Sequence, residues 1–191
     1  HRVVNMAFRD LLVDVKKIDA ETSVIHGILK DSRDLNHIPL VFDNLTEAPE
    51  HSAALNVLTR KRICETFDVS PGELIDVLAW AMNNPCEPEI IDSDQAPVME
   101  NTMEKVNLKK IPIPWHYPED RGRYQSASVI IAQYNGIRNM SFHRQFLRDE
   151  NHTVSRFVPR HLRTMTDLAA KEGKDVDIAV INGADAVVLL A

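Results

Sequence analysis

The chain has 191 residues, enough for one large domain or two small ones with a buried core. Its hydrophobic share of 44% and charged share of 26% are typical of a soluble globular protein, and no apolar run approaches the roughly 20 residues of a membrane span. The net charge of −6 argues against general nucleic-acid binding, which normally needs a basic surface. Cys64 and Cys86 lack the spacing of a zinc site or a disulfide framework, so we expect reduced thiols in a cytoplasmic protein.

The first third of the chain is predicted to alternate helices and strands. Apolar residues from Phe8 to Ile18 repeat at helical spacing and predict an opening amphipathic helix. The segments "TSVIHGIL" (22–29) and "IPLVFDNL" (38–45) are rich in β-branched and apolar residues, which favours two strands joined by a polar turn. Helical spacing returns over residues 53–67 and predicts a second helix.

A third helix has a clear start signal in "VSPGELIDVLAWAM". Ser70 is the expected N-cap, Pro71 occupies the first helical position, and Glu73 completes a capping box. Trp80 and Met82 are expected to pack in the core. The expected buried stripe of this helix consists of Leu74, Val77, Leu78 and Ala81.

The composition changes between Asn83 and Asp120, where prolines interrupt every long periodicity. These prolines are Pro85, Pro88, Pro97, Pro112, Pro114 and Pro118. We therefore expect extended connecting chain and place a domain boundary near Glu100. The predicted organisation is an α/β N-terminal domain over residues 1–100, a proline-rich connection over 101–123, and a β-rich domain over 124–191.

After Tyr124 the pattern becomes that of a mainly antiparallel sheet. "SASVIIAQY" predicts a strand, Asn135-Gly136 is a strong hairpin signal, and "IRNMSFHRQFL" predicts one returning strand. Further along, we expect a third strand in "HTVSRFV", a crossing helix in "RHLRTMTDLAAKEG" that stops at Gly173, and a buried strand in "DIAVING". The fold class is thus predicted to be α+β.

A cationic stretch over residues 138–165 stands out in this acidic chain. It holds six arginines, three histidines and no lysine, and six arginines minus Asp149 and Glu150 leave a formal charge of +4. The planar fork of arginine binds phosphate or carboxylate through two parallel hydrogen bonds. An alternative interpretation is a solvated face on which the arginines pair with nearby acids, and the residues alone favour neither.

Hairpin pairing is expected to bring Arg144 near Arg156, Arg160 and His161. His161 would lie at a helix N-terminus, where free backbone amides favour an anion. Asn139 and a neutral imidazole can also offer ligands to a divalent metal, although a carboxylate, waters or a ligand phosphate would have to complete the site.

Three stretches together resemble the UbiD family of decarboxylases, which use prenylated flavin mononucleotide (prenylated FMN). They are "IPIPWHYPEDRGRYQSASVIIAQ", "GIRNMSFHRQFL" and "VPRHLRTM". The matching positions are His116, the turn "DRGRY" from Asp120 to Tyr124, the strand from Asn139 to Arg144, and His161, followed by "NGADAVVLLA". Arg121 stands where the family usually has glycine, and Ala186 where it usually has proline. The resemblance implies an α/β lobe followed by the beginning of a split β-barrel that binds the flavin.

Carried over residue by residue, the resemblance assigns the cationic stretch to one site. Asn139 and His161 resemble two protein ligands of a divalent metal, usually manganese, that holds the flavin phosphate, with K⁺ as a further ion. Arg160 would assist with the phosphate, and Arg144 resembles the arginine that meets the substrate carboxylate. The residues expected to line the cofactor are Met140, Ser141, Phe142 and His143. On an ideal strand Asn139 and Arg144 face opposite sides, so we expect a twist, a bulge, or Asn139 at the strand end.

The implied activity is decarboxylation of an aromatic or α,β-unsaturated acid, in which the flavin acts as the electron sink. The family's third metal ligand (a glutamate), its proton donor and its oligomerising region would lie beyond Ala191, so we expect an N-terminal portion of a longer homo-oligomeric enzyme, inactive in isolation. Expected partners are a small carboxylic acid and a flavin prenyltransferase. The alternatives are a non-catalytic half-length subunit or assembly module, and a flavin-binding β-barrel oxidoreductase, for which no redox partner site is found.

Overall fold

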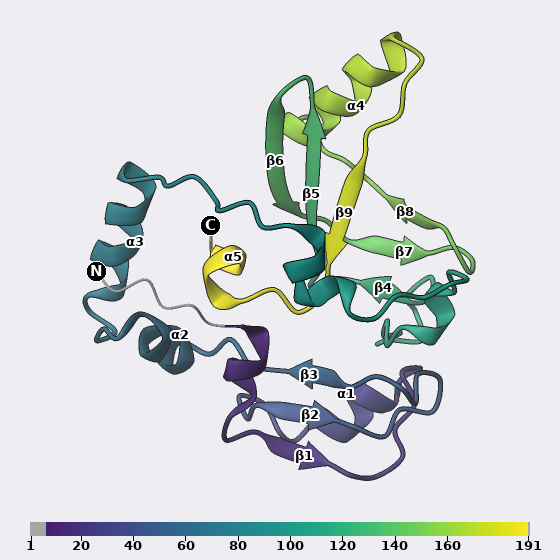
Figure 1. Ribbon diagram of the computed structural model, residues 1–191. Coiled ribbons are helices and arrows are strands. Elements are labelled where there is room, and N and C mark those ends of the chain that lie inside the picture. Colours follow the sequence, from purple (N-terminus) through teal and green to yellow (C-terminus); the bar gives the residue numbers. More distant parts are fainter. Residues whose placement is uncertain (1–6, 191) are drawn as a thin grey trace.

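The computed structural model describes residues 7–190, which form three separate three-stranded sheets and five α-helices (Figure 1). The strands are β1 (Lys16–Ile18), β2 (Leu40–Phe42), β3 (Ala53–Leu55), β4 (Tyr124–Gln125), β5 (Val129–Tyr134), β6 (Ile137–Phe142), β7 (Gln145–Leu147), β8 (Thr153–Ser155) and β9 (Ile178–Ile181). The helices are α1 (Gly27–Ser32), α2 (Arg60–Phe67), α3 (Leu74–Asn83), α4 (His161–Lys171) and α5 (Ala186–Leu190). The predicted α+β class is confirmed, and the sheets are open.

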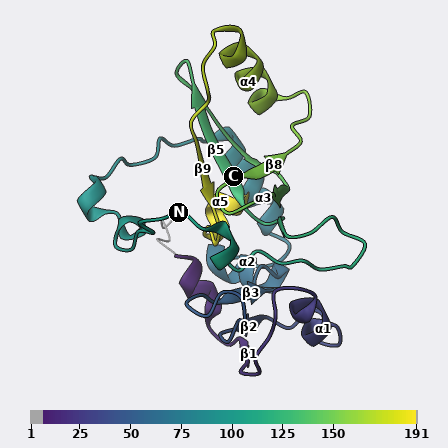
Figure 2. The same cartoon turned by 90° about the vertical axis from the view of Figure 1, so that its right-hand side faces the viewer.

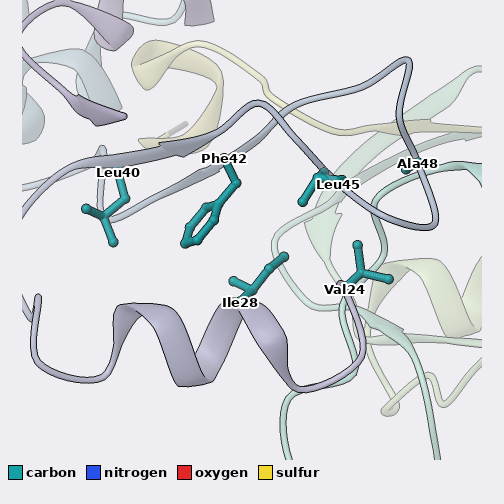
Figure 3. Packing of buried hydrophobic residues seen from close by; sticks show 6 residues of the cluster. All are labelled: Val24, Ile28, Leu40, Phe42, Leu45 and Ala48. Atoms are coloured by element: carbon teal, nitrogen blue, oxygen red, sulfur yellow. The ribbon is translucent and has the colours of Figure 1, made fainter. Parts of the chain in front are cut away.

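The first sheet provides the core of the N-terminal half. Strand β1 pairs with β2 in parallel and β2 pairs with β3 antiparallel, so β2 is central and buried along its whole length. Figure 3 shows Ile28 of α1 pointing toward β2 beside Phe42, with Leu40, Val24, Leu45 and Ala48 completing the cluster. The strand predicted in "IPLVFDNL" is therefore confirmed.

The strand predicted over residues 22–29 is wrong. This segment makes isolated bridges from Thr22 to Leu45 and from Ile25 to Trp115, and then turns into α1. His26 adopts a left-handed φ of 63°, which ends any extended conformation. The β-branched residues of the segment serve a helix–sheet core, and a short apolar run does not distinguish that arrangement from a strand.

Two predicted helices are shorter than expected. The opening helix is a 3₁₀ turn, Phe8–Leu12, and the chain after it becomes β1. The helix predicted over 53–67 divides into β3 and α2, because β3 pairs with β2 and Asn56 takes a left-handed φ of 58°. Helix α2 then begins at Arg60, where the Thr59 hydroxyl accepts a hydrogen bond from the amide of Arg62.

Helix α3 begins at Leu74, later than predicted, although the predicted contact at its start forms. The amide and hydroxyl of Ser70 donate to the Glu73 carboxylate at 2.9 and 2.6 Å. The core packing predicted for Trp80 and Met82 is wrong, since they are 50% and 85% exposed. Leu74 is buried, while the rest of the predicted stripe, Val77, Leu78 and Ala81, is half-buried or exposed. In Figure 1 α3 lies at the edge of the molecule, away from the three sheets.

The second half forms two antiparallel sheets, ordered β4-β7-β8 and β6-β5-β9. The predicted hairpin joins β5 to β6, and Asn135 and Gly136 both have positive φ, 49° and 77°. In Figures 1 and 2 α4 lies at the opposite end of the molecule from the β1-β2-β3 sheet. It packs on β5, where Leu162 and Met165 contact Ile130 and Ala132.

Two predictions in this half are corrected. The single strand predicted over 137–147 is two strands, β6 and β7, which belong to different sheets and are separated at His143 and Arg144. This break removes the alternation that would have set Asn139 and Arg144 on opposite faces of one strand. Strand β9 is largely exposed instead of buried, because it forms the edge of its sheet.

The proline-rich chain between Asn83 and Asp120 contains three 3₁₀ turns, Ser93–Gln95, Pro97–Met99 and Leu108–Lys110. It meets the N-terminal half at Trp115, whose amide donates to the carbonyl of Val24 at 2.9 Å and whose carbonyl accepts from the amide of His26 at 2.7 Å. The division into domains at 1–100, 101–123 and 124–191 stays a prediction. None of the helices within residues 7–190 has the length and apolar character to span a membrane.

Candidate functional site

The cationic stretch runs through β6, β7 and β8 to the start of α4. The chain changes sheet at His143 and Arg144, between β6 and β7. Strand β7 pairs with β8 so that Gln145 faces Ser155, and Arg144 and Arg156 each lie one residue beyond that pair. The fold thus brings Arg144 and Arg156 close together at the point where the chain changes sheet.

Strand β6 divides its side chains between two faces. Asn139 and Ser141 pair directly with Ala132 and Ile130 of β5. Since directly opposite residues share a face, Asn139 and Ser141 lie on the face that α4 covers. Met140 and Phe142 lie on the other face, where both are exposed. The four predicted lining residues therefore do not all present their side chains to one space.

His161 is the first residue of α4, as predicted, and is exposed. Arg160 occupies the N-cap position and provides no side-chain hydrogen bond to the first turn. The backbone N–H groups of the first turn therefore receive no hydrogen bond acceptor from the side chain of the N-cap residue. Free N–H groups of this kind attract phosphate and carboxylate groups to helix N-termini.

His143 lies with its ring edge against Phe157, at 5.0 Å between ring centroids. Burial lowers the pKa of His143 below its usual value of 6.5. The ring is therefore neutral at pH 7, and it contributes shape and a hydrogen-bonding nitrogen instead of positive charge.

The six arginines of the stretch fall into two groups. Arg148 pairs with Asp149 at 3.1 Å and Arg163 pairs with Asp167 at 2.8 Å. The remaining four have no carboxylate within 4.0 Å among residues 7–190; they are Arg138, Arg144, Arg156 and Arg160. Glu150, a further nearby acid, pairs with Lys109. The interpretation as a solvated, acid-paired face accounts for two arginines and leaves four cations for a ligand.

Arg144 lies over an aromatic ring. Its guanidinium carbon is 5.4 Å from the ring centroid of Tyr124 on β4, within the range of a cation–π contact. The guanidinium lies above the Tyr124 ring and has no carboxylate partner among residues 7–190, so its N–H groups can bind a planar anion.

The turn "DRGRY" is held to the preceding connection by Arg123, a role that sequence reasoning missed. Its guanidinium donates to the carbonyls of Ile113, Ile111 and Lys109 at 2.7, 2.7 and 3.0 Å. Burial lowers the pKa of Arg123, although the charge of Glu47 opposes that shift. The carbonyls of every second residue from 109 to 113 accept these hydrogen bonds, and no local sequence motif predicts the interaction.

A divalent metal fits Asn139 on chemical grounds. Its side-chain Nδ2 donates to Ser141 Oγ at 3.1 Å, which leaves Oδ1 as the free acceptor for a cation. Among residues 7–190, no three His, Cys, Asp or Glu side chains cluster closely enough to hold a metal ion on their own. Asn139 and His161 would therefore need further ligands, including the phosphate of a cofactor.

The most evident surface hollows lie elsewhere. One of about 670 Å³ is lined by α2 and the segment before α3, and another of about 430 Å³ lies between α2 and the opening turn. Neither of these two hollows is lined by residues of the cationic stretch.

The fold is that of solved UbiD-class enzymes. It is similar to an evolved dimeric form of the UbiD-class enzyme HmfF from Pelotomaculum thermopropionicum in complex with prFMN, with a TM-score of 0.87, 25% identity, and coverage of 93% of this chain and 44% of that one. Vanillic acid decarboxylase from Sedimentibacter hydroxybenzoicus shares the fold at a TM-score of 0.86 and 17% identity, over 98% of this chain and 45% of that one.

The sequence agrees with the fold. Residues 89–191 match the family model described as UbiD, 3-octaprenyl-4-hydroxybenzoate carboxy-lyase Rift-related domain. That match covers more than half of the chain, and the chain belongs to the UbiD family.

Relatives with an assigned activity are decarboxylases. Anhydromevalonate phosphate decarboxylase from Methanothermobacter thermautotrophicus is 31% identical over 156 residues, which are 80% of this chain and 36% of that protein. The enzyme of the same name from Archaeoglobus fulgidus is 39% identical over 87 residues, 45% of this chain and 20% of that protein. The matched part of the chain thus spans about a third of the length of the first relative and a fifth of the second.

Proposed function

We propose that the protein containing this chain is a non-oxidative decarboxylase of an α,β-unsaturated or aromatic carboxylic acid, using prenylated FMN and a divalent metal such as Mn²⁺. The observation that supports this most is that Arg144, Arg156 and Arg160 have no carboxylate partner among residues 7–190, in the stretch that also carries Asn139 and the N-terminus of α4. A cofactor phosphate, its metal and a substrate carboxylate together account for such a cationic surface on an acidic chain.

Each residue has a distinct role in this proposal. Asn139 Oδ1 and the imidazole of His161 bind the metal, while Arg160 and the free amides of α4 bind the flavin phosphate. Ser141 and His143 line the cofactor by their side chains. Met140 and Phe142, on the other face of β6, contribute to the lining through the backbone of the strand between them.

Arg144 binds the substrate. Its guanidinium edge holds the carboxylate through two parallel hydrogen bonds and fixes the plane of that group. When bound, prenylated FMN supplies the electron sink that decarboxylation requires. Arg144 stays protonated throughout, so it orients the carboxylate and takes no part in proton transfer.

Anhydromevalonate phosphate is the substrate we propose, because the relatives with an assigned activity act on it by name. The same proposal includes a flavin prenyltransferase that supplies the cofactor, K⁺ as a further ion, a homo-oligomeric assembly and a cytoplasmic location. HmfF has been observed as an evolved dimer with prFMN, which supports the cofactor and the assembly.

The test is release of carbon dioxide by the protein at its natural length. The protein is loaded with prenylated FMN and Mn²⁺ and offered anhydromevalonate phosphate or, in parallel, an aromatic acid such as vanillic acid. We expect turnover of anhydromevalonate phosphate that disappears when the flavin is omitted. Flavin-loaded protein that releases carbon dioxide from neither acid would reject the proposed substrates, and flavin-independent turnover would reject the proposed chemistry.

A further inference from the structure

Four side chains form a continuous stack beneath the cationic stretch. The guanidinium of Arg144 lies 5.4 Å from the ring centroid of Tyr124. The Tyr124 ring lies 5.3 Å from the ring of Phe146, tilted by 50°. The guanidinium carbon of Arg121 lies over the Phe146 ring, 4.9 Å from its centroid. The order is therefore cation, ring, ring, cation.

The backbone fixes this stack. Tyr124 of β4 and Phe146 of β7 are directly paired antiparallel residues, so their rings share one face of the sheet. The chain passes close to Phe146 at Gly122, where a Cβ atom would lie 3.1 Å from the ring and φ is +154°. Glycine at this position admits the ring, and the amide of Tyr124 is held by the carbonyl of Pro114 at 2.9 Å. The position of Tyr124 is thus fixed by its pairing with Phe146 and by the hydrogen bond to Pro114, independently of Arg144.

The stack is the contact that orients Arg144. Arg144 is exposed and forms no ion pair with a carboxylate within residues 7–190, and its guanidinium lies over the Tyr124 ring. A flexible guanidinium without such a contact would sample many orientations, each of which places its donors differently. A ring held beside the guanidinium restricts the orientations that it can take, and no acid within residues 7–190 occupies its N–H donors.

We infer that Tyr124 is a positioning residue, whose ring sets the plane of the Arg144 guanidinium for a substrate carboxylate. This inference rests on the proposed function, since it assumes that Arg144 binds the carboxylate. It requires the ring of Tyr124 and not its hydroxyl, because the contact is made by the ring face. Phe146 and Arg121 support the ring from behind.

The experiment compares Tyr124→Leu with Tyr124→Phe in the flavin-loaded protein at its natural length, with anhydromevalonate phosphate as substrate. We expect Tyr124→Leu to lower kcat by about tenfold or more, because a misplaced carboxylate reacts slowly even when bound, while KM changes by about fivefold or less. Tyr124→Phe is expected to restore most of kcat. Crystal structures of both variants should show an ordered Arg144 guanidinium with phenylalanine and a disordered one with leucine.

Two further variants separate the possible failures. Tyr134→Leu is the matched control, since Tyr134 is also half-buried but packs in the β5–α4 core away from Arg144. An equal loss of kcat in Tyr134→Leu and Tyr124→Leu would overturn the inference, because it would indicate general destabilisation. Loss of turnover in Arg144→Ala with normal kcat in Tyr124→Leu would overturn the inference alone. Normal turnover in Arg144→Ala would instead reject the proposed role of Arg144, and the inference with it.

Discussion

At the scale of single residues, the important distinction lies among the arginines of the cationic stretch. The Asp149 carboxylate pairs with Arg148 Nε at 3.1 Å and with His152 Nδ1 at 2.7 Å. The hydrogen bond from His152, ahead of those from the Asn151 amide and Arg148, lowers the pKa of Asp149 to about 2. Arg148 thus stabilises the β7–β8 turn. Arg144, by contrast, pairs with no acid among the described residues, and its guanidinium lies over the Tyr124 ring.

This difference predicts the outcome of two equivalent substitutions. Arg144→Lys should keep the charge but lose most of the decarboxylase activity, since lysine cannot hold a planar carboxylate through two parallel bonds. A displacement of about 1 Å can cost on the order of a hundredfold in rate. Arg148→Lys, the matched control, should change activity little. The measurement is carbon dioxide release at equal flavin occupancy, and equal activity of the two variants would place the substrate arginine elsewhere.

The sequence predicted several site residues but not how they are held. His161 at a helix N-terminus followed from the apolar spacing after Pro159, which is a local signal. The contact of Tyr124 with Arg144 depends on the pairing of β4 with β7 and on the change of sheet at His143, neither of which has a local signature. Carbonyl binding by Arg123 depends equally on tertiary structure.

At the scale of elements, local turn chemistry proved the most reliable guide. The hairpin at Asn135-Gly136 forms because both residues adopt positive φ, which glycine and asparagine tolerate. The strand predicted at 22–29 failed because its apolar residues serve α1 and its flanking loop. The core prediction for Trp80 failed because, among residues 7–190, α3 lies apart from the three sheets in Figure 1 and Trp80 is half exposed.

The hairpin can be tested by matched glycine substitutions. Gly136→Ala should lower the free energy of unfolding by about 1 kcal/mol, because its φ of 77° is unfavourable for alanine even though no atom lies within 4 Å of the new Cβ. Gly72→Ala, where φ is not in the left-handed region and the nearest atom is 3.9 Å away, should change it by no more than about 0.5 kcal/mol. Chemical denaturation measures both values, and an equal effect would contradict the assignment of strain to Gly136.

At the scale of the whole molecule, Glu47 lies where the N-terminal core meets the connection. Its carboxylate accepts hydrogen bonds from Ser23 Oγ at 2.5 Å and from the amide of Val24 at 2.8 Å. Val24 in turn accepts a hydrogen bond from Trp115. Burial acts to raise the pKa of Glu47, but the hydrogen bonds from Ser23, Val24 and the backbone of Glu47 itself, together with the charge of Arg123, hold the pKa below its usual value of 4.5.

The lowered pKa gives a pH dependence with a defined sign. The ionised Glu47 stabilises the fold above pH 4.5, and this contribution is lost as the pH falls through the lower folded-state pKa. Glu47→Gln should therefore reduce the free energy of unfolding by about 1 kcal/mol at pH 7, a modest value because the side chain is partly exposed. The difference between the two proteins should shrink as the pH falls below 4.5. Denaturation at several pH values tests this, and a difference that grows on acidification would contradict it.

The central claim is that the cationic stretch holds a metal and a flavin phosphate at the N-terminus of α4. The most direct measurement is the flavin and manganese content of the purified protein at its natural length, compared between His161→Ala and His152→Ala. His152 is an exposed histidine of the same stretch that binds Asp149 in the β7–β8 turn. We predict that His161→Ala weakens retention of both flavin and metal by at least about tenfold, because it removes one of few ligands, while His152→Ala retains both. Full flavin and manganese content in purified His161→Ala protein would contradict the account.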